Sequence, residues 1–182
     1  MDISRFPSLT HLWCSQNKLT SLDVSKNKEL VGLYCYSNQL TNIDVAQLPK
    51  LQLLSCGENK LTSLDVSKNK ELLQLYCNGN QLTDLDVSKN TNLTTLVCHF
   101  NKIAGDAMSR LVNSLPDVNG KELATDATDA EKEVFRIFVL VDHVRIGEGN
   151  QYSKEDLRIA IQKGWKPYDR NGKWDERIPL QP

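Results

Sequence analysis

Five cysteines, three histidines and a regular series of aspartates are the residues of this 182-residue chain whose side chains could carry out chemistry. Thiolates and imidazoles bind zinc, and a thiolate beside a base is a nucleophile. Several aspartates that converge on one point bind calcium. The spacing of these residues along the chain decides which of these functions is possible.

The cysteines recur at a fixed interval of 21 residues, and each occupies the same place in the motif Leu-x-x-Leu-x-Cys-x-x-Asn. A constant period of about 20–50 residues indicates stacked structural units. The sequence has no Cys-x-x-Cys pair or Cys/His cluster of the kind that zinc sites use. The motif begins at Leu9, Leu30, Leu51, Leu72 and Leu93.

Stacking also argues against disulfide bonds. Equivalent cysteines of neighbouring units lie about 4.8 Å apart in such a stack. Their Cα–Cβ bonds run side by side, which disfavours a disulfide, and an odd number of cysteines cannot pair completely. We therefore interpret each cysteine as a small buried hydrophobic residue.

The residue pattern of each unit predicts two short extended segments. In the first coil the alternation places Leu12 and Cys14 inward and His11 and Trp13 outward on a short strand. The second half of the unit, Thr-x-Leu-Asp-Val-Ser-Lys-Asn, lacks helical spacing and predicts an extended segment on the convex side. The Asn that ends each motif is expected to form a buried ladder of amides that satisfies backbone groups out of reach of water.

The aspartates form a column with the same period. Like charges stacked about 5 Å apart cost energy unless they are compensated. Calcium is one remedy, and hydrogen bonds from nearby backbone N–H groups and Ser or Thr hydroxyls are the other. The spacing lacks the Gly-rich calcium repeat, so we favour hydrogen bonds and keep calcium as the alternative. The column is Asp2, Asp23, Asp44, Asp65 and Asp86.

These units resemble leucine-rich repeats, in the bacterial 21-residue class with the pattern LxxLxCxxNxLTxLDVSxNxx. The resemblance covers residues 2–103 and extends to surface and secreted proteins of Bacteroides-type bacteria. It implies a right-handed solenoid with a parallel β-sheet on its concave face, short extended segments on its convex face, and a binding function. It also implies a cell-surface or secreted location, although the chain shows neither a signal peptide nor a run of about 18 apolar residues.

The repeat decays after Ile103, which divides the chain into an array of about five coils at 1–103 and an α/β capping region at 104–182. Residues 2–5 match residues 23–26 of the next unit. The array thus starts in the middle of a repeat. We expect either a fragment of a longer array, which we favour, or a first edge that a partner covers. An unsealed stack would expose its core, so we expect the capping region to cover the last coil.

Several local signals predict the elements of the capping region. Helical spacing indicates a helix over 106–115 with Asp106 as its N-cap. The apolar run 135–141 indicates a buried strand. Ser153-x-x-Asp156 resembles a capping box before a second helix that ends at Lys163-Gly164. Beyond it, Asn171-Gly172 predicts a hairpin turn.

Aromatic residues occupy outward positions of the predicted strands. Such side chains offer a large contact area at low entropy cost, and they are enriched at binding hot spots. The alternative is that β-propensity alone places Trp and Tyr on strands. We expect the ligand-facing surface of the concave sheet to be lined by Trp13, Tyr34, Tyr36, Tyr76, His99 and Phe100.

No enzyme, metal site or cofactor is predicted. His11 and His99 lie four coils apart, about 19 Å at the coil spacing, and cannot share a metal. No phosphate-binding loop and no Ser, His and acid at identifiable spacing are present. Lys and Arg number 22 against 23 Asp and Glu, without a basic patch, which disfavours nucleic acid.

The sequence therefore predicts a non-catalytic binding module. We expect a protein partner, bound through the concave β face in adhesion or host–microbe recognition. A glycan-binding module and a structural spacer within a larger surface protein are the alternatives.

Overall fold

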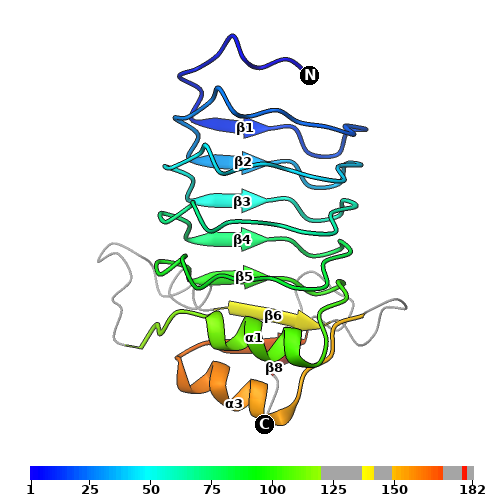
Figure 1. Cartoon of the computed structure of the whole chain (residues 1–182), viewed down its shortest axis with the longest axis vertical. Coiled ribbons are helices and arrows are strands. Elements are labelled where there is room, and N and C mark those ends of the chain that lie inside the picture. Colours follow the sequence, from blue (N-terminus) through cyan, green and yellow to red (C-terminus); the bar gives the residue numbers. More distant parts are fainter. Residues whose placement is uncertain (120–136, 142–148, 170–177, 180–182) are drawn as a thin grey trace.

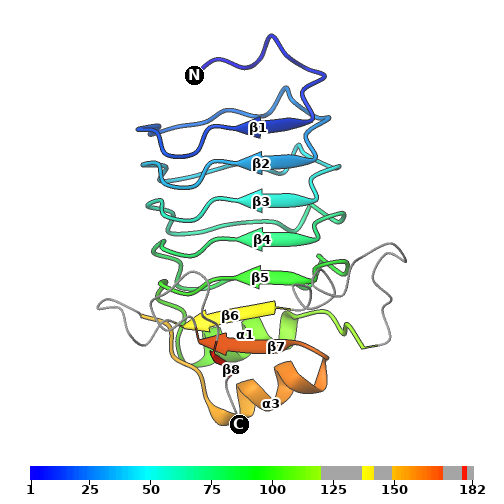
Figure 2. The same cartoon turned by 180° about the vertical axis from the view of Figure 1, so that it is seen from behind.

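The computed structural model describes residues 1–119, 137–141, 149–169 and 178–179. Their strands form one eight-stranded sheet in chain order, from β1 to β8. Figures 1 and 2 show the first five strands stacked one above another along the long axis of the molecule, with the N-terminus at one end and the helices at the other. These strands are β1 (His11–Trp13), β2 (Gly32–Tyr34), β3 (Leu53–Ser55), β4 (Gln74–Tyr76) and β5 (Thr95–Val97).

The register of the sheet follows directly from the period of the sequence. Neighbouring strands pair in parallel, with Leu12 opposite Leu33 and Leu33 opposite Leu54. Equivalent residues of successive coils therefore lie side by side, and each inward leucine packs on the next. Leu33 and Leu54 are 0% exposed. The predicted solenoid with its parallel sheet is confirmed.

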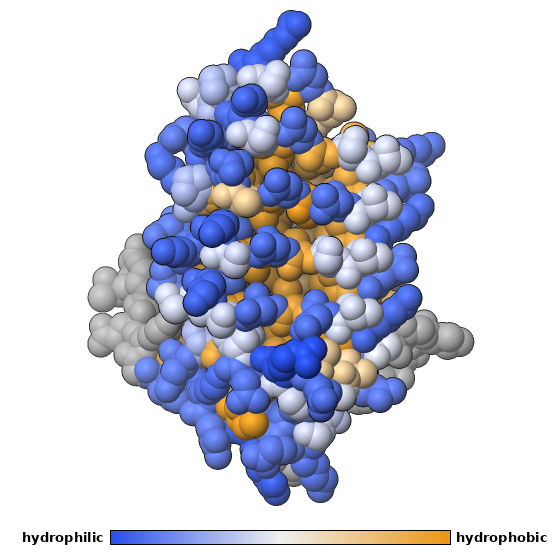
Figure 3. Space-filling model, in the orientation of Figure 1, coloured by the Kyte–Doolittle hydropathy of each residue, from blue (hydrophilic) through white to orange (hydrophobic). Residues whose placement is uncertain are grey.

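The convex side of each coil is built from extended segments and turns without a helix in the first four coils. Its inward column, Leu22, Ile43, Leu64 and Leu85, is 2–8% exposed. Figure 3, drawn from the side on which α1 (Asp106–Ser114) lies in front, shows apolar surface running along this side between hydrophilic edges.

All five cysteines are buried and outside any disulfide, as predicted for packing residues. Burial raises the pKa of the Cys56 and Cys77 thiols well above the ordinary value, and the neighbouring cysteine raises each further. Because the thiolate is the reactive and metal-binding form, these side chains stay chemically inert.

The asparagines form the predicted ladder. Asn59 Nδ2 donates to Cys56 O of its own coil and to Cys35 O of the preceding coil, both at 3.1 Å. Its Oδ1 accepts from Leu40 N at 2.9 Å. Each amide thus joins two coils, and the ladder satisfies backbone groups that no strand pairing reaches.

Asn59→Ala should lower the free energy of unfolding by about 2–3 kcal/mol, because it leaves the buried Leu40 N–H without a partner. Asn17→Ala is the matched control, since Asn17 is exposed and its amide donates to Cys14 O and Ser15 O of its own coil. We expect a loss of about 1 kcal/mol or less there. Urea unfolding of both variants measures the difference, and equal losses would contradict the cross-coil role of the ladder.

The aspartate column is compensated by hydrogen bonds. Asp23 Oδ1 accepts from Ser25 N at 2.9 Å and Asp65 Oδ1 from Ser67 N at 2.8 Å, and Asp2, Asp44 and Asp86 bond in the same way. The backbone N–H of Ser25 lowers the pKa of the Asp23 carboxyl, and its hydroxyl adds to this effect. These bonds are the ones expected from the sequence.

The C-terminal region continues the stack. β6 (Ile137–Val141) pairs in parallel with β5 and with β7 (Lys166–Asp169), and β7 pairs antiparallel with β8 (Ile178–Pro179). β6 agrees with the apolar run at 135–141, of which 135–136 lie outside the described residues. The antiparallel pair fits the predicted hairpin, whose turn at 171–172 also lies outside them. The division of the chain at residue 103 stays a prediction.

Asn150 supplies a sixth rung to the asparagine ladder. Its Oδ1 accepts from Ile103 N and its Nδ2 donates to Cys98 O, both at 2.9 Å. Asn101 makes the equivalent bonds to the coil before it, at Leu82 N and Cys77 O. The chain beyond the repeats therefore satisfies the last coil with the same chemistry that joins the coils to one another.

The two described helices pack against each other at the end of the stack. α1 begins after Gly105, whose φ is +55°, and no side chain caps it. The prediction of Asp106 as N-cap is thus wrong, because a left-handed glycine makes the turn and Asp106 is already helical. At the other end, Lys163 Nζ donates to Asn113 O at 2.6 Å and Leu115 O at 2.8 Å, which satisfies carbonyls at the C-terminus of α1.

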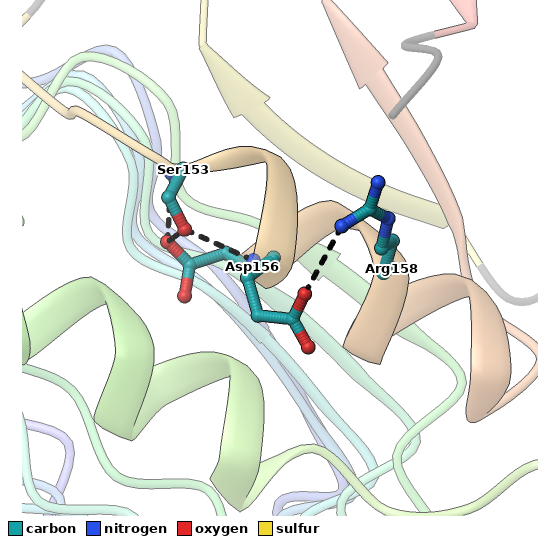
Figure 4. A network of polar contacts seen from close by, with 4 residues as sticks. Ser153, Asp156 and Arg158 are labelled. Atoms are coloured by element: carbon teal, nitrogen blue, oxygen red, sulfur yellow. Dashed lines mark hydrogen bonds and ion pairs between the residues drawn. The ribbon is translucent and has the colours of Figure 1, made fainter.

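The second helix, α3 (Lys154–Gln162), begins with the predicted capping box. Ser153 Oγ accepts from Asp156 N at 3.1 Å, and Asp156 Oδ2 accepts from Ser153 N at 2.7 Å. Figure 4 shows this pair, with the exposed Arg158 ion pair nearby. The helix ends before Gly164, whose φ is +82°, as predicted. Among the described residues no helix is long and apolar enough to cross a membrane.

Candidate binding face

The outward side of β1 to β5 forms one surface, which we call the strand face. It consists of three columns of residues with the repeat period, two within the strands and one just after them. None of its residues is Asp, Glu, Lys or Arg, although these types make up 25% of the chain. The columns are His11, Gly32, Leu53, Gln74 and Thr95; Trp13, Tyr34, Ser55, Tyr76 and Val97; and Ser15, Tyr36, Gly57, Asn78 and His99.

Three rings form a continuous stack at the N-terminal end of the strand face. The ring centroids of His11 and Trp13 are 5.4 Å apart with planes 13° from parallel. Those of Trp13 and Tyr34 are 5.1 Å apart with planes 9° from parallel. Gly32 makes room for this arrangement, because a Cβ at that position would lie 2.7 Å from His11 Cδ2. The stack holds the Trp13 indole in place while leaving it 68% exposed.

A groove of about 530 Å³ opens where this aromatic series is interrupted. The third coil has Ser55 and Gly57 in the columns that hold Tyr34 and Tyr36 one coil earlier and Tyr76 one coil later. These small residues leave a hollow between larger neighbours. A Cβ at Gly57 would lie 2.8 Å from Asn78 Oδ1, so glycine keeps this place open. The groove is lined by Gln16, Tyr36, Ser55, Gly57, Glu58, Tyr76 and Asn78.

A backbone position beside the strand face takes a left-handed conformation in every coil. The residues there have φ between +51° and +65°. This region is unfavourable for residues with a Cβ, and glycine is the residue that adopts it at least cost. Glu58 is the only Asp, Glu, Lys or Arg in this series. The series is Gln16, Ser37, Glu58, Gly79 and Phe100.

Most of the residues predicted for the ligand-facing surface do lie at the strand face. Trp13 and Tyr36 are exposed, and Tyr34 and Tyr76 are half-buried. Tyr36 and Tyr76 line the groove, whereas Trp13 and Tyr34 belong to the ring stack. Phe100 is half-buried and occupies the left-handed position of the fifth coil.

His99 differs from its expected place. His99 is only 1% exposed. Thr95 and Val97 of the same coil are also buried, with exposed fractions of 1% and 8%. These outward positions are buried at the coil where the C-terminal region joins the stack. The accessible part of the strand face therefore ends at β4, and His99 cannot contact a ligand there.

Sequence reasoning missed the residues that shape the groove. Ser55 and Gly57 carry little chemistry of their own, and their effect is to leave space. Gln16 and Glu58 lie outside the strand alternation that was used to select surface residues. A signal for the groove is nevertheless present in the sequence, because the aromatic column Trp13, Tyr34, Tyr76 is interrupted by Ser55 in the third coil, where the neighbouring column has Gly57.

Solved structures of bacterial repeat proteins resemble this chain. The functional domain of InlJ from Listeria monocytogenes, described as including a cysteine ladder, has 30% sequence identity and a TM-score of 0.52, covering 89% of this chain and 39% of that one. Internalin C2 from Listeria monocytogenes has 27% identity and a TM-score of 0.55, covering 57% of this chain and 47% of that one.

A Leptospira interrogans LRR protein has 25% identity and a TM-score of 0.62, covering 91% of this chain and 44% of that one. This chain thus spans less than half the length of each of these solved chains. No protein-family model and no curated protein matches it.

Proposed function

Because this chain is a bacterial leucine-rich repeat protein, we propose that it is a non-catalytic module that binds a protein partner through the strand face. The observation that carries the proposal is the uncharged strand face with its exposed ring stack and adjoining groove. The resemblance to bacterial leucine-rich repeat proteins supports a cell-surface or secreted location and a role in adhesion or host–microbe recognition.

The chemistry of the strand face matches that of protein interfaces. Charged residues are depleted at the centre of such interfaces, and Tyr and Trp are enriched there. Trp13 is held by rings on both sides, so little side-chain entropy remains to be lost on binding. Its exposed indole would bury a large apolar area against a partner.

The C-terminal region has a separate role in this proposal. We infer that residues 104–182 seal the array, since Asn150 satisfies Ile103 N and Cys98 O of the last coil. Coils without such a partner would expose both their core and their backbone groups. The sealed end leaves the strand face of β1 to β4 as the binding surface.

Replacing Tyr34 and Tyr76 together by alanine should weaken binding at least thirty-fold, the effect of removing one hot-spot contact of about 2 kcal/mol. Peptides selected from a random display library on the wild-type chain serve as the probe. The variant should unfold within about 1 kcal/mol of the wild type, since both side chains are partly exposed. A convex-face variant, Ser63→Ala, is the control and should bind the peptides normally. Unchanged binding by the double variant would refute the proposal.

A glycan is the second candidate ligand. Tyr36 and Tyr76 with the amides of Gln16 and Asn78 line the groove, and aromatic faces beside hydrogen-bonding groups also suit sugars. A glycan array probed with the same wild-type and double-variant chains separates the two. Binding of a glycan that depends on the tyrosines, without selection of peptides, would favour the second candidate.

A further inference from the structure

The groove on the strand face combines two tyrosines with one carboxylate. Tyr36 and Tyr76 line it from the second and fourth coils, and Glu58 lines it from the third. Two coil spacings amount to about 9–10 Å, and Tyr36 lies two residues further along its coil than Tyr34, the register partner of Tyr76 through Ser55, so the two tyrosines lie diagonally across the groove. A flat group in contact with a ring on each side needs about 7–8 Å. The hollow over the third coil therefore has room for one planar group that touches both tyrosines of the groove lining.

The charge at the groove favours a cation as that group. Glu58 is the only Asp, Glu, Lys or Arg among the lining residues and is exposed. The ion pairs found within the described part of the chain join Lys50 to Glu29, Arg110 to Asp84 and Arg158 to Glu155, and none involves Glu58. Tyrosine faces attract cations, and an unneutralised carboxylate adds to this attraction.

The remaining lining groups distinguish arginine from lysine. Ser55 offers a hydroxyl oxygen, and Gln16 and Asn78 offer amide oxygens. A guanidinium is planar, stacks on aromatic rings and carries five N–H donors for such acceptors, whereas an ammonium is a compact and strongly hydrated point charge. Building on the proposed function, we propose that the groove receives an arginine side chain of the protein partner, in contact with the rings of Tyr36 and Tyr76 and paired with Glu58.

The backbone conformation at position 58 indicates that the Glu58 side chain has a role beyond folding. Its φ is +51°, in the region where Gly79 serves the next coil with φ +65°. Glycine at position 58 would relieve the steric cost that a Cβ has there. The Glu58 side chain extends over the next coil, because a Cβ at Gly79 would lie 3.3 Å from Glu58 Cγ. The chain thus holds a carboxylate beside the groove at a position where folding favours glycine.

The test follows the backbone amide signals of Gly57 and Gly79 by NMR in the full chain. The probes are the capped tripeptides Gly-Arg-Gly and Gly-citrulline-Gly, which have the same shape and differ in charge, with Gly-Tyr-Gly as a third. We expect saturable shifts with the arginine peptide in the millimolar range, and at least five-fold weaker binding of the other two. Raising the salt concentration should weaken arginine binding, because an exposed pair is screened.

Variants at the left-handed position separate binding from folding. Glu58→Gln should weaken arginine binding about ten-fold and leave citrulline binding unchanged. Glu58→Gly should do the same while raising Tm by about 2–4 °C. Ser37→Gly, at the same position one coil earlier with φ +54°, is the matched control. It should raise Tm similarly and keep arginine binding.

Three results would overturn the inference: equal binding of arginine and citrulline, tighter binding of the tyrosine peptide, or arginine binding unaffected by Glu58→Gln. If display-selected peptides still require Tyr34 and Tyr76 in such a case, the proposed binding face stands and only the arginine assignment fails. If the selected peptides ignore those tyrosines, the proposed function itself fails.

Discussion

Leu54→Ala should lower the free energy of unfolding by about 2–5 kcal/mol, the range for truncating a fully buried leucine. Leu54 is 0% exposed and lies in the middle strand, where it pairs with Leu33 on one side and Leu75 on the other. Neither neighbouring coil can move to fill the cavity without disturbing its own register. The loss should therefore fall near the upper part of this range.

The matched control is Leu12→Ala. Leu12 has the same place in its coil but is 9% exposed and belongs to β1, which pairs with β2 alone in the described sheet. Fewer neighbours and a site that can relax should reduce the loss to about 1–2 kcal/mol.

Urea unfolding followed by circular dichroism measures both variants. A stack in which each coil contacts only its neighbours loses cooperativity when a middle coil is damaged. We expect the Leu54 variant to unfold in a broader transition than the wild type, and the Leu12 variant to keep a sharp one. Equal losses in the two variants would contradict a core that is continuous through the third coil.

Trp165→Ala should separate α3 from the segment that follows α1 within the C-terminal region, at a cost of about 3–5 kcal/mol. Trp165 is 2% exposed, and its Nε1 donates to Pro116 O at 2.8 Å. Its backbone N–H bonds to Ala160 O at 3.0 Å, at the end of α3. Trp165 thus ties α3 to the segment that follows α1, through its backbone on one side and its indole on the other, and removal of the indole leaves both a cavity and a carbonyl without its donor.

Trp165→Phe isolates the hydrogen bond from the packing. The phenyl ring retains most of the buried apolar contact and loses only the Nε1 donor, so we expect about 1–2 kcal/mol. Limited proteolysis then reports where the alanine variant opens. Cleavage should begin beyond Ser114 and leave the coils of β1 to β4 intact, since a solenoid opens from its end. Cleavage spread evenly over the chain would contradict this role of Trp165.

The repeat by itself was sufficient to predict the coil. A period of 21 residues means that equivalent residues meet across the sheet, so inward leucines, buried cysteines and the asparagine ladder follow from alternation and hydrogen-bond requirements. Asn38, Asn59 and Asn80 all make the same cross-coil bonds. Each of these bonds joins an asparagine to the cysteine 24 residues before it, so the same pair of residues recurs with every repeat.

The repeat period could not predict how the C-terminal region joins the last coil. Asn150 bonds to residues 47 and 52 positions earlier, outside the repeat distance. The tripeptide Gly-Asn-Gln at 149–151 repeats that at 79–81, which is a faint signal of the sixth rung. The burial of His99 has no comparable signal, because it depends on which segment packs over the fifth coil.

What the sequence determined about this protein is therefore its coil: the period, the inward residues and the places where aromatic rings could face a partner. The tertiary structure decided which of those rings meet and which are accessible. It stacked Trp13 on Tyr34, removed His99 from the surface and left a groove over Ser55 and Gly57 beside Glu58. The physical reason is that local hydrogen bonds and alternation repeat with the chain, whereas space and exposure arise only when the coils are stacked.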